Sequence, residues 1–240
     1  MSGAGESRVA RRLAAELELE RAIHGLMIHE LGNPLQSLLV LIELSRDELA
    51  DAALGEDRLL TPGAEWVARP AERLDRALAS IRRLRQVLLS SGRIRARLSD
   101  SPGIDHPLDH WGPLLDDFLA LVGERLTQLS AGLIRSTEEI DRRPVGPGYV
   151  RAATLGLLVG ISEQISHARS TGLKDMILEL HGEVQGSRTC LRVAVHGPGG
   201  PVELAPELSA RVDDLLGEDA RAGSRREGRS LVIWSSGHGP

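Results

Sequence analysis

The chain has 240 residues, of which 41% are apolar and 26% are charged, so it can bury the core of one large or two modest domains. A net charge of −5 and an aromatic content of 2% argue against a nucleic-acid-binding protein, although residues 69–97 are rich in arginine. Apolar runs such as 38–42 are far shorter than the ~20 residues that a bilayer span requires. The N-terminal residues mix arginine with glutamate and form no signal core, so we expect a cytoplasmic protein. The single Cys190 excludes an internal disulfide and a cysteine-rich metal site.

Two long helices are predicted in the first part of the chain. Between about residues 9 and 53 the apolar residues recur three and four apart without a Gly-Pro turn, which predicts one long helix. Its apolar stripe comprises Leu31, Leu35, Leu38, Ile42 and Leu49. A second helix is predicted from Thr61 and Pro62, which suit a cap and a first helical position, to about Gly92. Pro70 should bend this helix near its start.

The second helix carries a matching apolar stripe, formed by Leu74, Leu78, Ile81 and Leu88. Two antiparallel helices alone cannot bury both stripes. We therefore expect two copies of the chain to pair into a four-helix bundle, which makes the protein a homodimer.

A polar stretch with prolines and a glycine at 93–110 is predicted to be a linker, and the expected domains are residues 1–97 and 98–240. The second domain alternates element types. We expect helices at 114–129 and 150–168, a strand at 133–140, and a β-hairpin of strands 176–184 and 189–195. Helices packed on one face of a sheet are the architecture that follows.

The most informative side chain of the first helix is His29. At ~100° per residue, His29 points about 160° away from Leu31 of the apolar stripe, so it should face solvent. The same arithmetic places three more side chains on this exposed surface: Asn33, Gln36 and Val40. Pro34 removes a helical hydrogen bond at a cost of ~3 kcal/mol, which suggests a kink with a purpose.

The segment 29–35, His-Glu-Leu-Gly-Asn-Pro-Leu, resembles the phosphoacceptor box of bacterial sensor histidine kinases. The usual form of that box is His-Glu-Leu-Arg-Thr/Asn-Pro-Leu, in the first helix of a dimeric hairpin. Gly32 stands where the family generally has Arg or Lys, and Ile28 where it commonly has Ser. The resemblance implies an α plus α/β fold: a dimerisation and phosphotransfer hairpin, followed by a histidine-kinase-type ATPase-like α/β sandwich.

The positions that would bind nucleotide in such a sandwich are altered in this chain. Gly160 and Gln164 stand at the apparent asparagine positions of the magnesium-binding helix, so the metal ligands are lost. Val195 replaces the aspartate that reads adenine, and valine cannot accept a hydrogen bond. Gly197 and Gly199 keep the glycines of that box, although such a string usually marks a turn. The later glycine-rich lid box is reduced to 227–231, and we expect a degenerate domain that holds no ATP, no metal and no other cofactor.

An intact acceptor beside a degenerate nucleotide site implies a histidine phosphotransferase of a phosphorelay, with response-regulator receiver domains as partners. His29 would carry the phosphoryl group between receiver aspartates, as a nucleophile, and Glu30 would orient the ring or take its proton. The receiver would supply the magnesium. Leu26, Gln36 and Val40 are the predicted docking residues. The protein also resembles two-domain relay phosphotransferases with a vestigial kinase fold.

Two alternatives remain open from the sequence. In a receiver phosphatase, Asn33 would position the attacking water, since Glu-x-x-Asn resembles the phosphatase motif of bifunctional kinases. In a non-catalytic dimeric module, the same bundle would sequester a regulator, and His29→Ala would leave its biology unchanged. An autophosphorylating kinase is disfavoured by the altered nucleotide positions.

Overall fold

The computed structural model describes residues 3–54, 64–98, 110–146, 148–217 and 221–236. The expected cap at Thr61 and Pro62 and most of the expected linker lie outside these ranges. The chain forms two compact units, one made of Met1–Leu26 with Ser90–Pro240 and the other of Met27–Leu89. The expected domain boundary between residues 97 and 98 falls at the end of the second helix and stays a prediction.

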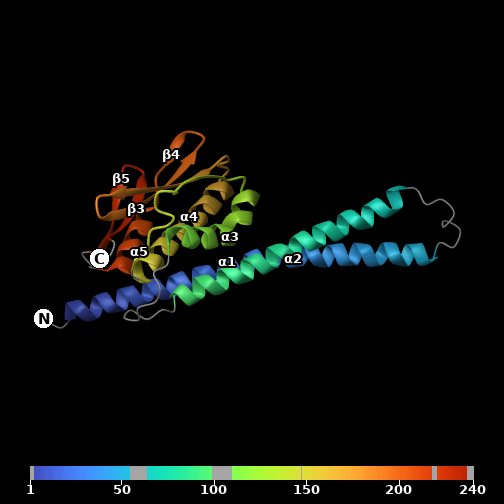
Figure 1. Ribbon diagram of the computed structural model, residues 1–240, viewed down its shortest axis with the longest axis horizontal. Coiled ribbons are helices and arrows are strands. Elements are labelled where there is room, and N and C mark those ends of the chain that lie inside the picture. Colours follow the sequence, from blue (N-terminus) through green and yellow to red (C-terminus); the bar gives the residue numbers. More distant parts are fainter. Residues whose placement is uncertain (1–2, 55–63, 99–109, 147, 218–220, 237–240) are drawn as a thin grey trace. The chain divides into compact units, whose positions relative to one another are not determined.

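The two long helices are α1 (Gly3–Leu54) and α2 (Ala64–Leu98), as the apolar periodicity predicts (Figure 1). α1 continues through Pro34, which is buried. α2 passes the predicted end at Gly92 and stops at Leu98. A glycine in an exposed helix costs only about 1 kcal/mol, so Gly92 does not end the helix.

The face of α1 that is buried within the chain differs from the predicted stripe. Its buried residues follow a four- and three-residue spacing: Ala15, Leu19, Ile23, Leu26, Glu30 and Pro34. Leu35 and Ile42 of the predicted stripe are 54% and 62% exposed, and Leu31 and Leu38 are half-buried. Leu74, Leu78, Ile81 and Leu88 of α2 are exposed as well. Each helix therefore has a second apolar face that one chain leaves uncovered.

The first unit contains an α/β domain built on a mixed sheet. The strands are β1 (Gly132–Ser136), β2 (Ile177–Gln185), β3 (Arg188–Gly197), β4 (Gly200–Val202), β5 (Ala222–Glu227) and β6 (Ser230–Ser236). Their order is β1-β2-β3-β6-β5, with β4 paired to β3. β1 is parallel to β2, and the other pairs are antiparallel. Helices α3 (Trp111–Gln128), α4 (Gly148–Ser170) and α5 (Pro206–Leu216) lie on one side of the sheet (Figure 1).

The predicted α plus α/β class is confirmed. The predicted hairpin is β2–β3, and the predicted helices are α3 and α4. The predicted strand at 133–140 stops at Ser136 because the chain turns there, with the amides of Ile140 and Asp141 donating to the carbonyl of Thr137. Residues 150–162 of α4 are all buried, so this helix forms the centre of the domain. No helix in the described part of the chain has the length and hydropathy of a membrane span.

The first part of α1 packs on the α/β domain within the same unit. Cδ1 of Leu19 lies near Gly156 of α4, and Glu18 is 3.6 Å from Arg211 of α5. The guanidinium of Arg12 lies 5.8 Å from the ring centre of Tyr149. The α/β domain is therefore fixed to α1 on the N-terminal side of His29.

Gly182 of β2 provides a test of this core. A Cβ there would lie 2.6 Å from Cδ1 of Ile140 and 3.2 Å from the Cα of Thr137. Because overpacking costs about 1 to 3 kcal/mol, Gly182→Ala should lower the Tm of the α/β domain by several degrees in calorimetry. Gly123→Ala in α3 is the control, since a Cβ at Gly123 meets nothing within 4 Å. Equal Tm values for the two variants would contradict this packing.

Candidate functional site

His29 and Glu30 are neighbours on α1 that differ in exposure to solvent. The side chain of His29 is 50% exposed, whereas that of Glu30 is 0% exposed. Successive helical residues are ~100° apart, so the α-helix itself separates an outward ring from an inward carboxylate. Nδ1 of His29 nevertheless lies 3.5 Å from Oε1 of Glu30. The predicted solvent exposure of His29 is confirmed.

Arg83 of α2 contacts the same buried carboxylate. Its Nη2 donates a hydrogen bond of 3.3 Å to Oε2 of Glu30, and its side chain is 21% exposed. Glu30 thus lies between a cation on one side and an imidazole on the other. Sequence reasoning missed Arg83, because one arginine in an arginine-rich helix gives no signal until the pairing of the two helices is known.

The predicted neighbours of His29 divide into two groups. Gln36 and Val40 are exposed and Asn33 is half-buried, as expected for residues on or beside an exposed surface. Leu26 is only 3% exposed, so its predicted place on a docking surface is wrong. Leu26 follows Leu19 and Ile23 on the buried face of α1. The apolar stripe predicted from the sequence is a different one and so does not identify this face.

Two of the altered nucleotide positions, Gly160 and Gln164, contact residues in α5 and in the segment before it. Gly160 of α4 packs directly against Cδ2 of Leu208 in α5. Nε2 of Gln164 donates to the carbonyl of Glu203 at 2.8 Å, and the amide of Ala205 donates to Oε1 of Gln164 at 3.3 Å. Gln164 therefore hydrogen-bonds to the backbone of the segment that leads into α5.

The glycine string after Val195 forms a turn. Val195 is fully buried in β3 and pairs with Leu178 of β2 and Val202 of β4. Gly197 pairs with Gly200, with Pro198 and Gly199 between them, so both predicted box glycines belong to the β3–β4 turn. This outcome matches the more common role of such a string.

Residues 227–231, which the sequence predicts to be a reduced lid box, span the turn of the β5–β6 hairpin. Glu227 of β5 pairs with Ser230 of β6, and Gly228 has a φ of 60°. A positive φ after a strand is typical of a two-residue hairpin turn, for which glycine is the favoured residue. The sequence therefore contains a hairpin here and not a phosphate-binding loop.

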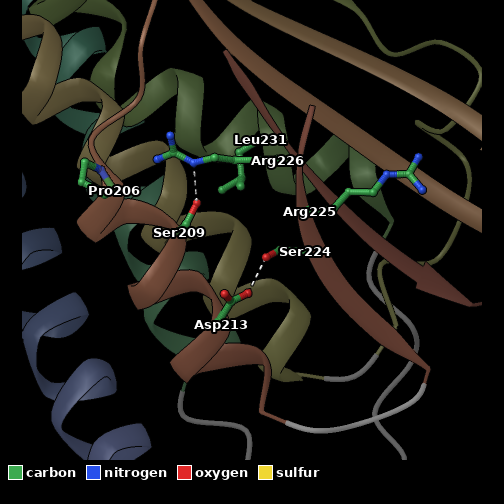
Figure 2. A pocket seen from close by; sticks show the side chains of 7 residues that line it. All are labelled: Pro206, Ser209, Asp213, Ser224, Arg225, Arg226 and Leu231. Atoms are coloured by element: carbon green, nitrogen blue, oxygen red, sulfur yellow. Dashed lines mark hydrogen bonds between the residues drawn. The ribbon is translucent and has the colours of Figure 1, made fainter. Parts of the chain in front are cut away.

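A shallow pocket of about 340 Å³ lies between α5 and the β5–β6 hairpin (Figure 2). Arg226 points across it to Ser209, and its guanidinium also donates to the carbonyls of Leu204 and Ala205. Its charge thus serves the packing of α5 on the sheet. Arg225 points away from the other labelled side chains (Figure 2).

Other candidates for metal or nucleophile chemistry are weak within the described residues. No cluster of three or more His, Cys, Asp or Glu side chains suited to a metal ion occurs there. Burial raises the pKa of the Cys190 thiol, and nearby Glu183 raises it further, which disfavours the reactive thiolate. His29 with Glu30 remains the best candidate site.

The comparisons with known proteins give no family model and no curated protein that matches the chain. Solved structures do match it. The histidine kinase AdeS of Acinetobacter baumannii is 16% identical, with 88% of this chain and 98% of that chain covered and a TM-score of 0.40. A bacterial phosphotransferase is 14% identical, with 92% and 96% covered and a TM-score of 0.44. The histidine kinase domain of the Erythrobacter litoralis blue-light activated kinase EL346 is 13% identical, with 91% of each chain covered and a TM-score of 0.35.

These matches are of the kind that the resemblance of segment 29–35 implies. Because these three identities are 16% or lower and these three TM-scores are below 0.5, we base the functional conclusion on the geometry around His29.

Leu26 and Val40 of α1 form a matched pair for testing the corrected surface. Leu26→Glu would bury an unpaired carboxylate, so it should lower the Tm by several degrees. Val40 is 46% exposed, so Val40→Glu should leave the Tm within about one degree of the wild-type value. Circular dichroism melts of the two variants provide the measurement. A Leu26→Glu variant that melts like the wild type would restore Leu26 to the exposed surface.

Proposed function

We propose that the protein is a histidine phosphotransferase of a two-component phosphorelay. It accepts a phosphoryl group on His29 from the aspartyl phosphate of one receiver domain and passes it to the aspartate of another. The observation that carries this proposal is the exposed imidazole of His29 backed by the buried carboxylate of Glu30. A solvent-facing nucleophile with a fixed acid behind it suits transfer between two protein surfaces.

The chemistry needs few groups from this chain. A neutral imidazole attacks the phosphorus, and the developing positive ring faces Glu30, whose carboxylate orients it or accepts its proton. Phosphoryl transfer depends chiefly on positioning and on neutralising charge, and the receiver's magnesium supplies the latter. Asn33, Gln36 and Val40 then serve as the contact surface for the receiver, and Asn33 is also the residue that a phosphatase activity would use.

The packing of the α/β domain supports a relay that does not use ATP. Leu208 occupies the space beside Gly160, and Gln164 is engaged with the backbone of Glu203 and Ala205. Val195 is buried between two strands and offers no acceptor for adenine. In this proposal the phosphoryl group comes from another protein.

The uncovered faces of α1 and α2 support the homodimer. Leu35, Ile42, Leu74, Leu78 and Ile81 are each 46% to 65% exposed in one chain. Full burial of a leucine stabilises by about 1.5 to 3 kcal/mol, so a partner hairpin that covers these faces would be strongly favoured. A four-helix bundle is the arrangement that covers both helices at once.

His29→Ala should abolish labelling by a phosphorylated cognate receiver and leave the helical content and the oligomeric state unchanged, because the ring is half-exposed. Labelled receiver and gel autoradiography provide the measurement. His24→Ala, which alters another exposed histidine of α1, is the control and should be labelled at the wild-type rate. Equal labelling of the His29 variant and the wild type would exclude the proposed function. Loss of receiver phosphate that persists in His29→Ala and stops in Asn33→Ala would favour the phosphatase.

ATP at millimolar concentration should leave the Tm unchanged, because a ligand that binds the native state must raise it. Val195→Asp should not restore binding, since Leu208 and Gln164 still fill the neighbouring space. Differential scanning fluorimetry with and without magnesium tests both proteins. A Tm increase of several degrees in the wild type would show that the domain is a working nucleotide site.

Light scattering at micromolar concentration should give twice the monomer mass. Ile42→Glu should shift the protein toward the monomer without unfolding it, because Ile42 is 62% exposed in a single chain. Gln36→Glu adds the same charge on the His29 surface and should remain dimeric. A wild-type monomer, or an Ile42→Glu dimer of unchanged stability, would contradict the proposed bundle.

A further inference from the structure

Arg83 holds one oxygen of the Glu30 carboxylate while the other oxygen faces His29. Nη2 of Arg83 lies 3.3 Å from Oε2, and Nδ1 of His29 lies 3.5 Å from Oε1. The carboxylate has no exposure to solvent, so water does not compete to orient it. Its direction is set by the protein groups around it, and Arg83 is a charged donor among them.

We infer that Arg83 is a positioning residue for phosphoryl transfer at His29. By holding Oε2, it turns Oε1 toward Nδ1 and so favours the imidazole tautomer that carries its hydrogen on Nδ1. The effect of Arg83 on phosphoryl transfer rests on the proposed function. The tautomer of His29 is a property of the protein without a receiver. At 3.5 Å the two atoms are too far apart for a hydrogen bond, so the carboxylate acts on the ring through its charge, and we expect the contact to shorten when a receiver binds.

The tautomer decides which nitrogen reacts. With hydrogen on Nδ1, the lone pair of Nε2 is free to attack phosphorus. The Nε2–P bond forms while the bond from phosphorus to the receiver's aspartyl oxygen breaks, and that oxygen keeps the electron pair. The ring becomes a cation with its N–H directed at Glu30. The return step to the next aspartate reverses these changes, so the same contact serves both directions.

Stability alone does not account for this pair. A buried ion pair is often no more stabilising than apolar side chains of similar size, because both charges lose their hydration. The pair instead fixes the orientation of the carboxylate beside the half-exposed ring of His29. A direction that is fixed before the receiver arrives lowers the barrier without further reorganisation.

The test uses the full chain and four variants. Arg83→Met removes the charge but keeps most of the volume, and Arg83→Lys keeps the charge. Arg85→Met is the matched control, since Arg85 is an exposed arginine of the same helix. Arg83→Gln also removes the charge but keeps a polar side chain beside Glu30, so it replaces Arg83→Met if that variant does not fold.

Nitrogen-15 NMR at a pH where His29 is neutral reads the tautomer without a receiver, and rapid-quench kinetics read the transfer. We expect the wild type to carry hydrogen mainly on Nδ1, and Arg83→Met and Arg83→Gln to shift toward hydrogen on Nε2. The maximal transfer rate of Arg83→Met should be about ten- to a hundredfold below that of the wild type. Its half-saturating receiver concentration should stay within about twofold of the wild-type value. Arg83→Lys should recover part of the Nδ1 tautomer and part of the transfer rate, and Arg85→Met should match the wild type in both.

Two outcomes overturn the inference: an unchanged tautomer in Arg83→Met and Arg83→Gln, or an Arg85→Met variant as slow as Arg83→Met. If no receiver labels the wild type but the tautomer responds to Arg83, the proposed function fails and the positioning role stands. If transfer through His29 occurs and Arg83→Met changes neither readout, the inference fails and the proposed function stands.

Discussion

The structure around His29 depends on a carboxylate that is buried one residue away from an exposed imidazole. A buried carboxylate needs a donor or a cation, because its lost hydration is otherwise uncompensated. Arg83 of α2 supplies such a cation to Glu30 of α1, so the pairing of the two helices contributes to the site. The outward direction of His29 follows from the helical geometry.

The α/β domain is held together by close packing of α5 on the central helix α4. α4 is buried along residues 150–162, and α5 contacts it through Leu208 at Gly160. Such contacts add apolar burial to the core. The same unit holds the first part of α1 through Leu19 and the ion pair of Glu18 with Arg211. The α/β domain therefore packs on the first part of α1.

The elements that sequence analysis predicted are those with strong periodicity. α1, α4 and the β2–β3 hairpin have long apolar patterns or a glycine between alternating strands. α5 and the β5–β6 hairpin were missed because they are short, and β5 reads Ala-Gly-Ser-Arg-Arg-Glu, with little apolar content. The exposure of His29 followed from helical angles, but Leu26 and Arg83 depend on which face of α1 meets its neighbours. Two apolar faces compete on that helix, and sequence spacing does not rank them.

The position of the phosphoryl group tests the central claim most directly. Phosphorus-31 and nitrogen-15 NMR of the protein, after transfer from a phosphorylated receiver, identify the atom that carries it. The account predicts one phosphorus–nitrogen bond, at Nε2 of His29, with hydrogen on Nδ1 facing Glu30. A phosphoryl group on Nδ1 of His29, on a different histidine or on a carboxylate would contradict it.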